Sequence, residues 1–351
     1  MVGHFCLFET GFKTDAFKNV ALCVQFFFIL SGFALCYGYG EKMRTGATSF
    51  LSFAWQRLAR LYPLHLATML LAFVCIPPLI PLMEKGTLAY NTVLNVFLLQ
   101  AVGFSTWSLN LVSWSISTEF WAGLIVLPLA FRYLSARSAF ILSVCGYAAI
   151  YVTAGYLRTQ YWLVVPGVNV GMLSTASAML LGVALCRWAM DIDFSLTLGR
   201  TVRTLTGALE FCLLAAILWM SYLARHGAIE FLCVVLMPFL IFSTAVSKSW
   251  MNQLLESRPM LWLGKISYSL YLLHVPILGA LTLIGIAKIE SLELRFAVYA
   301  SVVLATSAIS YRYFEHPVYL KLRSLRLPGA KVSQRRLIDQ EPVGGENAPL
   351  R

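Results

Sequence analysis

Nine long apolar stretches follow one another along this chain and leave it few possible folds. A helix needs about 20 residues to cross roughly 30 Å of hydrocarbon, and only helices or closed barrels satisfy their backbone there. Since 59% of the residues are hydrophobic and 12% are charged, we predict an all-α, polytopic transmembrane helical bundle of nine spans plus a truncated first helix. The stretches run approximately over residues 20–37, 62–82, 112–131, 138–154, 171–188, 206–223, 228–246, 266–286 and 296–314.

Two shorter apolar pieces do not fit this scheme. Residues 93–104 are bracketed by asparagine and glycine, and we predict a re-entrant or interfacial segment rather than a span. Residues 1–8 are apolar apart from His4 but cannot cross the membrane. No basic region and cleavage site precede the first full span, so we expect no signal peptide. We expect instead that the functional protein begins upstream, with about 15 to 20 further residues that complete this helix.

The basic residues are distributed unevenly over the predicted loops. Placing Lys42 and Arg44 in the cytoplasm and threading the nine spans leaves 20 of the 27 Lys and Arg residues on the inner side and seven outside, as the positive-inside rule requires. The net charge of +11 therefore indicates topology and not nucleic-acid binding, because the charges are scattered among apolar spans. We expect a multi-pass protein of the cell inner (plasma) membrane with a cytoplasmic C-terminus and with membrane lipids as partners.

The chain is predicted to hold one membrane domain, residues 1–323, followed by a disordered, basic cytoplasmic tail, residues 324–351, where the apolar periodicity is lost. Its eight cysteines lie in or beside apolar runs without a C-x-x-C pair, so we interpret them as buried small hydrophobes. We predict no metal, because no metal-ligand spacing is visible. The sequence does not indicate the oligomeric state.

An acidic residue, Glu119, lies inside the predicted span 112–131. A charged side chain is costly in hydrocarbon, so a carboxylate at this depth is a functional-site hypothesis by default. Ser115 lies four residues earlier on the same helical face, and Trp114 and Ser117 are close by. We therefore predict a polar cavity inside the bundle, lined by these residues.

Two arginines, Arg57 and Arg60, are three residues apart directly before the span that begins at Tyr62. Neighbouring guanidiniums on one helix can hold a phosphate by bidentate hydrogen bonds. The alternative is that they are ordinary positive-inside anchors. At the end of the last span, Glu315 is expected to pair with Arg312.

His4 lies at the outer end of the truncated first helix, and the predicted topology places Glu119 near the same membrane face. A histidine that is hydrogen-bonded to a carboxylate becomes a stronger base and keeps one tautomer, as the deprotonation of an attacking hydroxyl requires. One interpretation is that the two residues meet and exchange a proton. The alternative is an incidental histidine near a chain end.

A late segment, residues 261–276, carries Ser267, Tyr271 and His274 on one helical face. Pro276 is expected to interrupt the helix just after them. One interpretation is that the three side chains line the site, although their spacing alone favours a structural role. The alternative is an interfacial aromatic belt beside a proline kink.

Five motifs in this order resemble those of the acyltransferase-3 family of integral membrane O-acyltransferases. Residues 26–33 (FFFILSGF) resemble its F-F-x-L-S-G-F, 57–63 (RLARLYP) its R-x-x-R-I-x-P, 114–119 (WSISTE) its W-S-L-S-x-E, 264–276 (GKISYSLYLLHVP) its G-x-x-S-Y-x-x-Y-L-x-H-x-P, and 315–317 (EHP) its closing E-x-P. A single motif is weak, but five in order are specific.

The resemblance implies an enzyme that moves an acyl group, typically acetyl, from cytoplasmic acyl-CoA to a hydroxyl of a cell-surface or exported glycan. It implies that His4 and Glu119 are catalytic and that Arg57 and Arg60 bind the acyl-CoA, which is a donor substrate and not a bound cofactor. Gln25 departs from the acid common at its position. The alternative function is a transporter or flippase of a glycan or lipid-linked intermediate, but the internal repeats and paired broken helices typical of transporters are not visible in the sequence.

Overall fold

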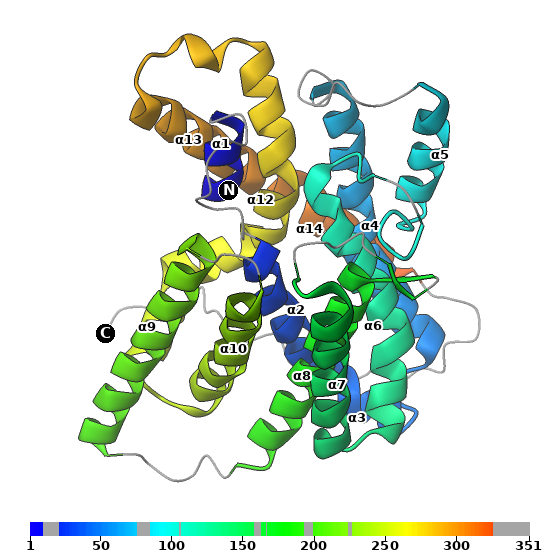
Figure 1. Ribbon diagram of the computed structural model, residues 1–351, viewed down its shortest axis with the longest axis vertical. Helices are drawn as coiled ribbons and strands as arrows, with labels where there is room; N and C mark the ends of the chain where they lie inside the picture. The colour runs from blue at the N-terminus through cyan, green and yellow to red at the C-terminus, as the bar shows by residue number, and fades with distance from the viewer. Residues whose placement is uncertain are drawn as a thin grey trace, which may run out of the picture.

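The structure is a computed structural model that describes residues 1–9, 21–75, 85–104, 107–157, 163–165, 167–192, 199–223 and 227–325. Nearly all of the predicted tail, from residue 326 on, lies outside these residues. Within them the chain is a bundle of helices, with one short antiparallel pair of strands, β1 (Leu163–Val165) and β2 (Val168–Asn169) (Figure 1).

Nine helical segments of the described residues are long and apolar enough to cross a membrane, and each overlaps one predicted stretch. The predicted all-α, polytopic fold is therefore confirmed. Six of the segments are single helices: α4 (Phe50–Cys75), α7 (Ala136–Ala154), α8 (Val170–Met190), α9 (Arg200–Leu223), α10 (Ala228–Val246) and α12 (Arg258–Leu283). The segment Leu22–Arg44 joins α2 (Ala21–Leu35), the π-helical turn η1 (Cys36–Gly40) and α3 (Glu41–Arg44), and Leu111–Tyr133 joins the 3-10 turn η3 (Leu111–Ser113) and α6 (Trp114–Tyr133). The segment Leu292–Ser324 joins α13 (Leu292–Ser310), the π-helical turn η5 (Tyr311–Glu315) and α14 (His316–Ser324).

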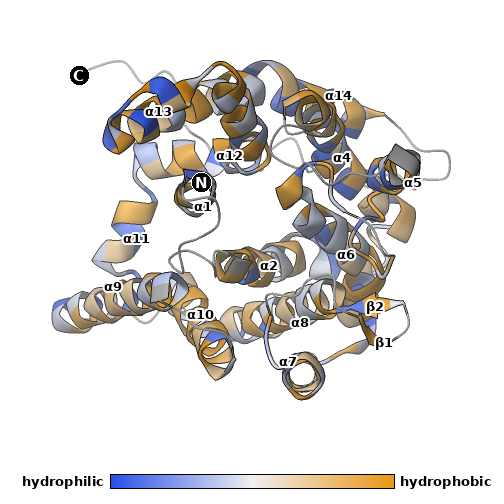
Figure 2. Ribbon diagram, turned by 45° about the horizontal axis from the view of Figure 1, so that its top comes forward, coloured by the Kyte–Doolittle hydropathy of each residue, from blue (hydrophilic) through white to orange (hydrophobic). Residues whose placement is uncertain are grey.

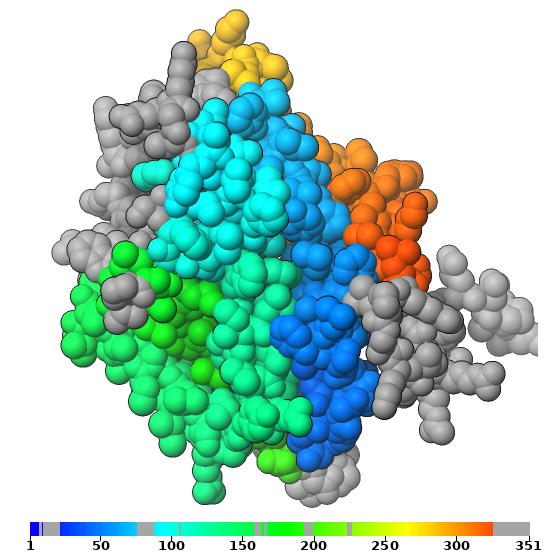
Figure 3. Space-filling model, turned by 90° about the vertical axis from the view of Figure 1, so that its right-hand side faces the viewer, coloured from blue at the N-terminus to red at the C-terminus, as the bar shows by residue number. Residues whose placement is uncertain are grey.

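Shorter helices complete the bundle. They are α1 (Val2–Glu9), α5 (Lys85–Val96), α11 (Trp250–Leu255) and the 3-10 turn η4 (Ile286–Lys288). In the space-filling view, the blue residues of α4 lie between the cyan and green residues of α5 and α6 and the orange residues of the C-terminal helices (Figure 3). This position of α4 lets its side chains reach α6 on one side and the C-terminal elements on the other.

Two helices continue through prolines, one beside the predicted start of a span and one at a predicted interruption. The helix α4 begins at Phe50 and contains Pro63, so the span does not begin at Tyr62. The helix α12 continues past Pro276 to Leu283. Proline removes the N–H that would bond the carbonyl four residues earlier, which is that of Leu272 here, and the side-chain amide of Asn110 donates to this carbonyl at 2.8 Å. A tertiary contact thus replaces the missing helical bond.

The helices α2 and α8 cross in close contact at the centre of the bundle (Figure 2). A Cβ at Gly32 would lie 2.2 Å from the carbonyl oxygen of Met179, and one at Gly182 would lie 2.1 Å from that of Ile29. Small residues allow such backbone contact between membrane helices. The glycine of the F-F-x-L-S-G-F-like motif, Gly32, therefore allows α2 to pack closely against α8. In this arrangement the neighbouring Ser31 lies beside α6.

The segment 93–104 does not form a crossing helix, as predicted, because α5 ends at Val96 and turns follow. The backbone of Leu98 and Ala101 in these turns is buried and held by α6. The hydroxyl of Ser117 donates to the Leu98 carbonyl at 2.5 Å and accepts from the Ala101 N–H at 3.2 Å, and the Trp121 indole N–H also donates to Leu98, at 3.0 Å. Non-helical backbone at membrane depth is tolerated when protein groups satisfy it in this way.

Candidate active site

The helix α1 is held against α12 and α13, which fixes the position of His4 (Figure 1). The Phe5 ring stacks on Tyr299 with centroids 5.3 Å apart, and Glu9 forms an ion pair with Arg295 of α13. Apolar packing at one end and an ion pair at the other thus dock this short helix. Its stability comes from these tertiary contacts, since eight residues are too few for a helix that is stable alone.

The structure brings His4 and His274 together. The Nδ1 atom of His4 lies 3.0 Å from Nε2 of His274, and the other ring nitrogen of His274, Nδ1, lies 2.6 Å from the carbonyl oxygen of Tyr271. A carbonyl can only accept, so Nδ1 of His274 carries a proton. In the neutral ring Nε2 then accepts, and Nδ1 of His4 must donate to it. The lone pair of neutral His4 is thereby assigned to its Nε2.

Glu119 has different partners from those predicted. Its Oε1 atom accepts from Nη2 of Arg57 and from the hydroxyl of Ser31, each at 2.9 Å. The expected pairing with His4 is therefore replaced by an ion pair with Arg57. The physical reason is the early start of α4, which carries Arg57 into the bundle, where a guanidinium compensates a buried carboxylate better than a neutral imidazole does. Gly123, which has no side chain, faces this guanidinium.

Arg60 points to another part of the bundle. Its guanidinium forms an ion pair with Glu315 and lies 5.4 Å from the ring centroid of Tyr268, and Glu315 also accepts from the Ser269 hydroxyl at 2.5 Å. The predicted pairing of Glu315 with Arg312 is wrong, because the π-helical turn η5 places Glu315 inside the protein.

The two arginines therefore do not form one open phosphate clamp in this structure, because each has its own carboxylate. The side chain of Arg57 is 9% exposed, whereas that of Arg60 is 36% exposed. Arg60 is consequently the more accessible of the two cations.

Side chains from α6 and α12 meet next to the histidine pair. The hydroxyls of Ser115 and Tyr271 lie 2.8 Å apart, and Tyr271 is one turn before His274. The Trp114 ring packs edge-on against Phe28, with centroids 6.2 Å apart. Ser115 and Tyr271 thus lie at the predicted place, and Trp114 is part of the apolar packing beside it.

Two other predicted lining residues do not join the histidine pair. Ser117 holds the segment before η3, as described above. Ser267 lies near the start of α12, where its side chain is exposed on the protein surface, and its hydroxyl donates to the Gly264 carbonyl of the same helix. The buried serine of this motif is Ser269, which contacts Glu315.

Sequence reasoning missed several partners that the structure reveals, namely Ser31, Asn110, Ser269 and the second histidine as the contact of the first. Ser31 and Ser269 lie in two of the motifs, so their presence there could have identified them as candidate site residues. Asn110 lies in a loop and carries no motif that would have pointed to α12. Among the described residues no group of three His, Cys, Asp or Glu side chains could hold a metal ion, and the eight cysteines are free thiols.

Comparison with known proteins agrees with the motifs. A family model described as an acyltransferase domain matches residues 2–312. The chain is 27% identical over 271 residues to the acyltransferase MdmB of Streptomyces mycarofaciens, covering 72% of this chain and 67% of that protein. It is 38% identical over 92 residues to "Protein 2 in picA locus" of Rhizobium radiobacter, covering 23% of this chain and 48% of that protein. No solved structure matches the chain.

Proposed function

This chain belongs to the acyltransferase-3 family of membrane acyltransferases, and we propose that it transfers an acyl group from acyl-CoA to a glycan hydroxyl. The enzyme is a multi-pass membrane protein. In the proposed reaction the transferred group is acetyl and the donor binds from the cytoplasm. The acceptor is a cell-surface or exported glycan. The proposed location is the plasma membrane, with the C-terminus in the cytoplasm. The support for this orientation is the excess of Lys and Arg in the loops on that side.

The observation that carries the proposal is the pairing of His4 with His274. Nε2 of His4 accepts the proton of the acceptor hydroxyl while the hydroxyl oxygen bonds the thioester carbonyl carbon. The tetrahedral intermediate then expels the coenzyme A sulfur as the C–S bond breaks, and the proton on Nε2 passes to the leaving thiolate. His274 acts as a positioning residue, because its contact keeps His4 in the tautomer whose Nε2 is free to accept.

Neighbouring groups support the two substrates in this proposal. The hydroxyls of Tyr271 and Ser115 both donate to the Val112 carbonyl in this structure, and in the proposed reaction they rotate away from it to donate to the oxyanion. Arg60 is the candidate for the donor's phosphates, because it is accessible and a guanidinium matches phosphate geometry. Arg57 and Glu119 contribute by holding α4, α2 and α6 in register around the site.

The proposal is tested on the purified protein in lipid nanodiscs with acetyl-CoA labelled in its acetyl group and a panel of soluble oligosaccharides. We expect label to move to a glycan, and His4→Ala to lower kcat by about 100-fold or more, the range of a lost general base. The control is Val152→Ala, whose side chain is 81% exposed on α7 and should leave kcat unchanged. A His4→Ala variant as active as the unmodified protein would remove His4 from the reaction.

A further inference from the structure

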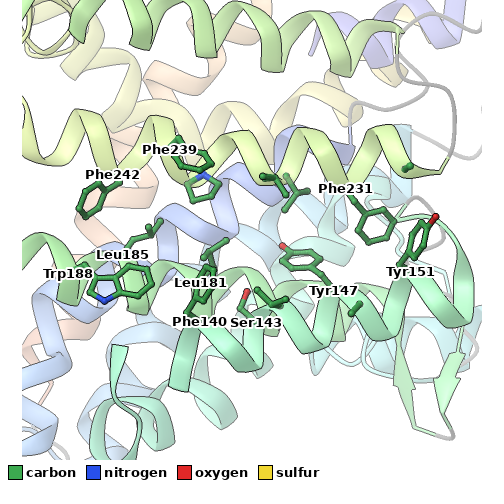
Figure 4. Close-up of a pocket in the computed structure, with 16 residues that line it drawn as sticks. Phe140, Ser143, Tyr147, Tyr151, Leu181, Leu185, Trp188, Phe231, Phe239 and Phe242 are labelled. Carbon is green, nitrogen blue, oxygen red and sulfur yellow. The ribbon is translucent and has the colours of Figure 1, made fainter. Parts of the chain in front are cut away.

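A groove of about 750 Å³ runs between α7 and α10, with α8 as its floor (Figure 4). It is separate from the histidine pair, because it lies on the other side of α8 and α2 (Figure 2). Leu181, Leu185 and Trp188 form the floor. Phenylalanine and tyrosine rings of α7 and α10 line both walls (Figure 4).

The lining of this groove offers hydrocarbon almost everywhere. The Tyr147 hydroxyl donates to Oε1 of Gln25 at 3.0 Å and so is already bonded inside the protein. The Ser143 side chain is buried, and its hydroxyl has no hydrogen-bond partner among the described residues, so it is a polar group in an otherwise apolar wall. A polar ligand would therefore find few partners here, whereas an aliphatic chain would find carbon on three sides.

The groove opens toward the bilayer. Both wall helices have membrane length and low charge, and wall residues such as Val144, Val235 and Phe239 are half exposed or more. Lipid is therefore the medium in contact with this opening. A void at such a surface forfeits dispersion contacts that a well-fitted chain restores.

The length of the groove agrees with a single acyl chain. From Phe140 to Tyr151 there are eleven helical steps of about 1.5 Å, or about 17 Å along α7. From Ala228 to Phe242 there are fourteen steps, or about 21 Å along α10. An acyl chain that reaches from the interface to the midplane covers about half of the roughly 30 Å of hydrocarbon. The groove is long enough for such a chain and too short for a long isoprenoid.

An arginine, Arg137, lies beyond one end of the groove. Arg137 precedes Phe140 by three residues, and Phe140, Val144 and Ala148 follow one another four residues apart, so these side chains form one stripe on α7. Arg137 is exposed, and the adjacent mouth of the groove is formed by Phe140 and Trp188, whose ring centroids are 5.4 Å apart. A phosphate at this mouth would lie next to a guanidinium.

We propose that this groove is a binding site for a bilayer glycerophospholipid, with one acyl chain lying between α7 and α10 and the phosphate at Arg137. The site lies outside the acyl-transfer machinery. Its ligand is a lipid of the surrounding membrane and not a substrate.

The test uses nanodiscs that contain phosphatidylglycerol with a photoreactive diazirine in one acyl chain, with the labelled peptides mapped by mass spectrometry. We expect labels to concentrate on the groove-lining residues of α7, α8 and α10. Ala148→Trp fills the groove from an exposed position and should lower this labelling about tenfold, which corresponds to about 1.4 kcal/mol. Arg137→Gln should lower it about fivefold, the effect of one surface cation on a lipid phosphate.

The matched control is Val152→Trp, which adds the same side chain to α7 at an exposed position outside the groove lining and should leave the labelling unchanged. Labelling spread evenly around the perimeter of the bundle would overturn the proposal. So would undiminished labelling in Ala148→Trp. Stronger labelling of the same peptides by a diazirine isoprenoid phosphate than by the phospholipid would assign the groove to a lipid carrier instead.

Discussion

At the scale of single residues, the site depends on which proton each imidazole carries. The contact of His274 with the Tyr271 carbonyl determines the tautomer of both rings, since Nδ1 of His274 faces a backbone carbonyl that can only accept and Nε2 faces His4. His274 is nearly fully buried, so water does not compete for this arrangement. The late G-x-x-S-Y-x-x-Y-L-x-H-x-P-like motif thus has a structural reason for its histidine.

The first residue-scale prediction concerns His274. His274→Ala should lower kcat about 10- to 100-fold, the usual cost of losing an orienting partner, with little change in the KM for acetyl-CoA. His274→Gln should recover most of the activity, because its amide oxygen can accept from Nδ1 of His4. The pH profile of kcat should also shift in the alanine variant and not in the glutamine variant. Equal kcat and identical profiles in all three proteins would show that His274 does not act through His4.

The second residue-scale prediction separates the roles of the two arginines. Arg60→Lys should raise the KM for acetyl-CoA about tenfold with kcat retained, because a lysine keeps the charge but loses bidentate phosphate geometry. Arg57→Lys serves as the comparison, since Arg57 is bonded to Glu119 inside the protein. It should lower thermal stability in detergent more than it changes KM. The reverse pattern would assign the donor's phosphates to Arg57.

At the scale of helices, prolines show how much the sequence could predict and where it stopped. The nine apolar stretches are visible in the sequence because length and composition define a span, and all nine overlap helices. The predicted start at Tyr62, next to Pro63, and the predicted interruption at Pro276 were wrong because local rules treat proline as a break. The partner that removes the penalty at Pro276 is Asn110, which lies far away in sequence. Such long-range contacts cannot be predicted from a single sequence.

The same limit applies to the candidate site. The motifs identified Arg57, Glu119 and His274 as polar residues in apolar surroundings, which physical cost alone makes conspicuous. Their pairing depends on how α2, α4 and α6 pack, with Ser31 of α2 reaching Glu119 of α6 and Gly123 of α6 leaving room for the Arg57 guanidinium. A sequence can show that a charge needs a partner without showing which partner it finds.

The element-scale prediction is a double-mutant cycle for the bond from Asn110 to α12. Asn110→Leu should destabilise the protein by about 1 to 3 kcal/mol, because the buried Leu272 carbonyl loses its donor. In a Pro276→Ala background the restored N–H at position 276 can bond this carbonyl, so the same change should cost less. Unfolding in mixed micelles of increasing denaturing detergent measures both. Additive effects of the two substitutions would show that Asn110 does not compensate for the proline.

At the scale of the whole molecule, the two ends of the bundle differ in charge. The end of α6, the start of α7 and the start of α9 carry Arg132, Arg137 and Arg200, and these three helix ends lie at the lower end of the bundle in Figure 1. The connection from α12 to α13 lies at the upper end, near α1 with His4. From the positive-inside rule we predict that the lower end is cytoplasmic, which would put the histidine pair toward the outside, the side from which the proposed acceptor arrives.

The prediction at this scale is a topology. In a background with the eight cysteines replaced by alanine, a cysteine is placed at Ser135, between α6 and α7, or at Ser291, before α13; both positions are exposed. A membrane-impermeant thiol reagent added to intact cells should label position 291 directly and position 135 only after permeabilisation, because the basic loops stay inside. Retained acyl transfer in both variants is the control for folding. Labelling of position 135 in intact cells would invert the bundle, and it would then place the histidine pair toward the cytoplasm, on the same side as the proposed donor.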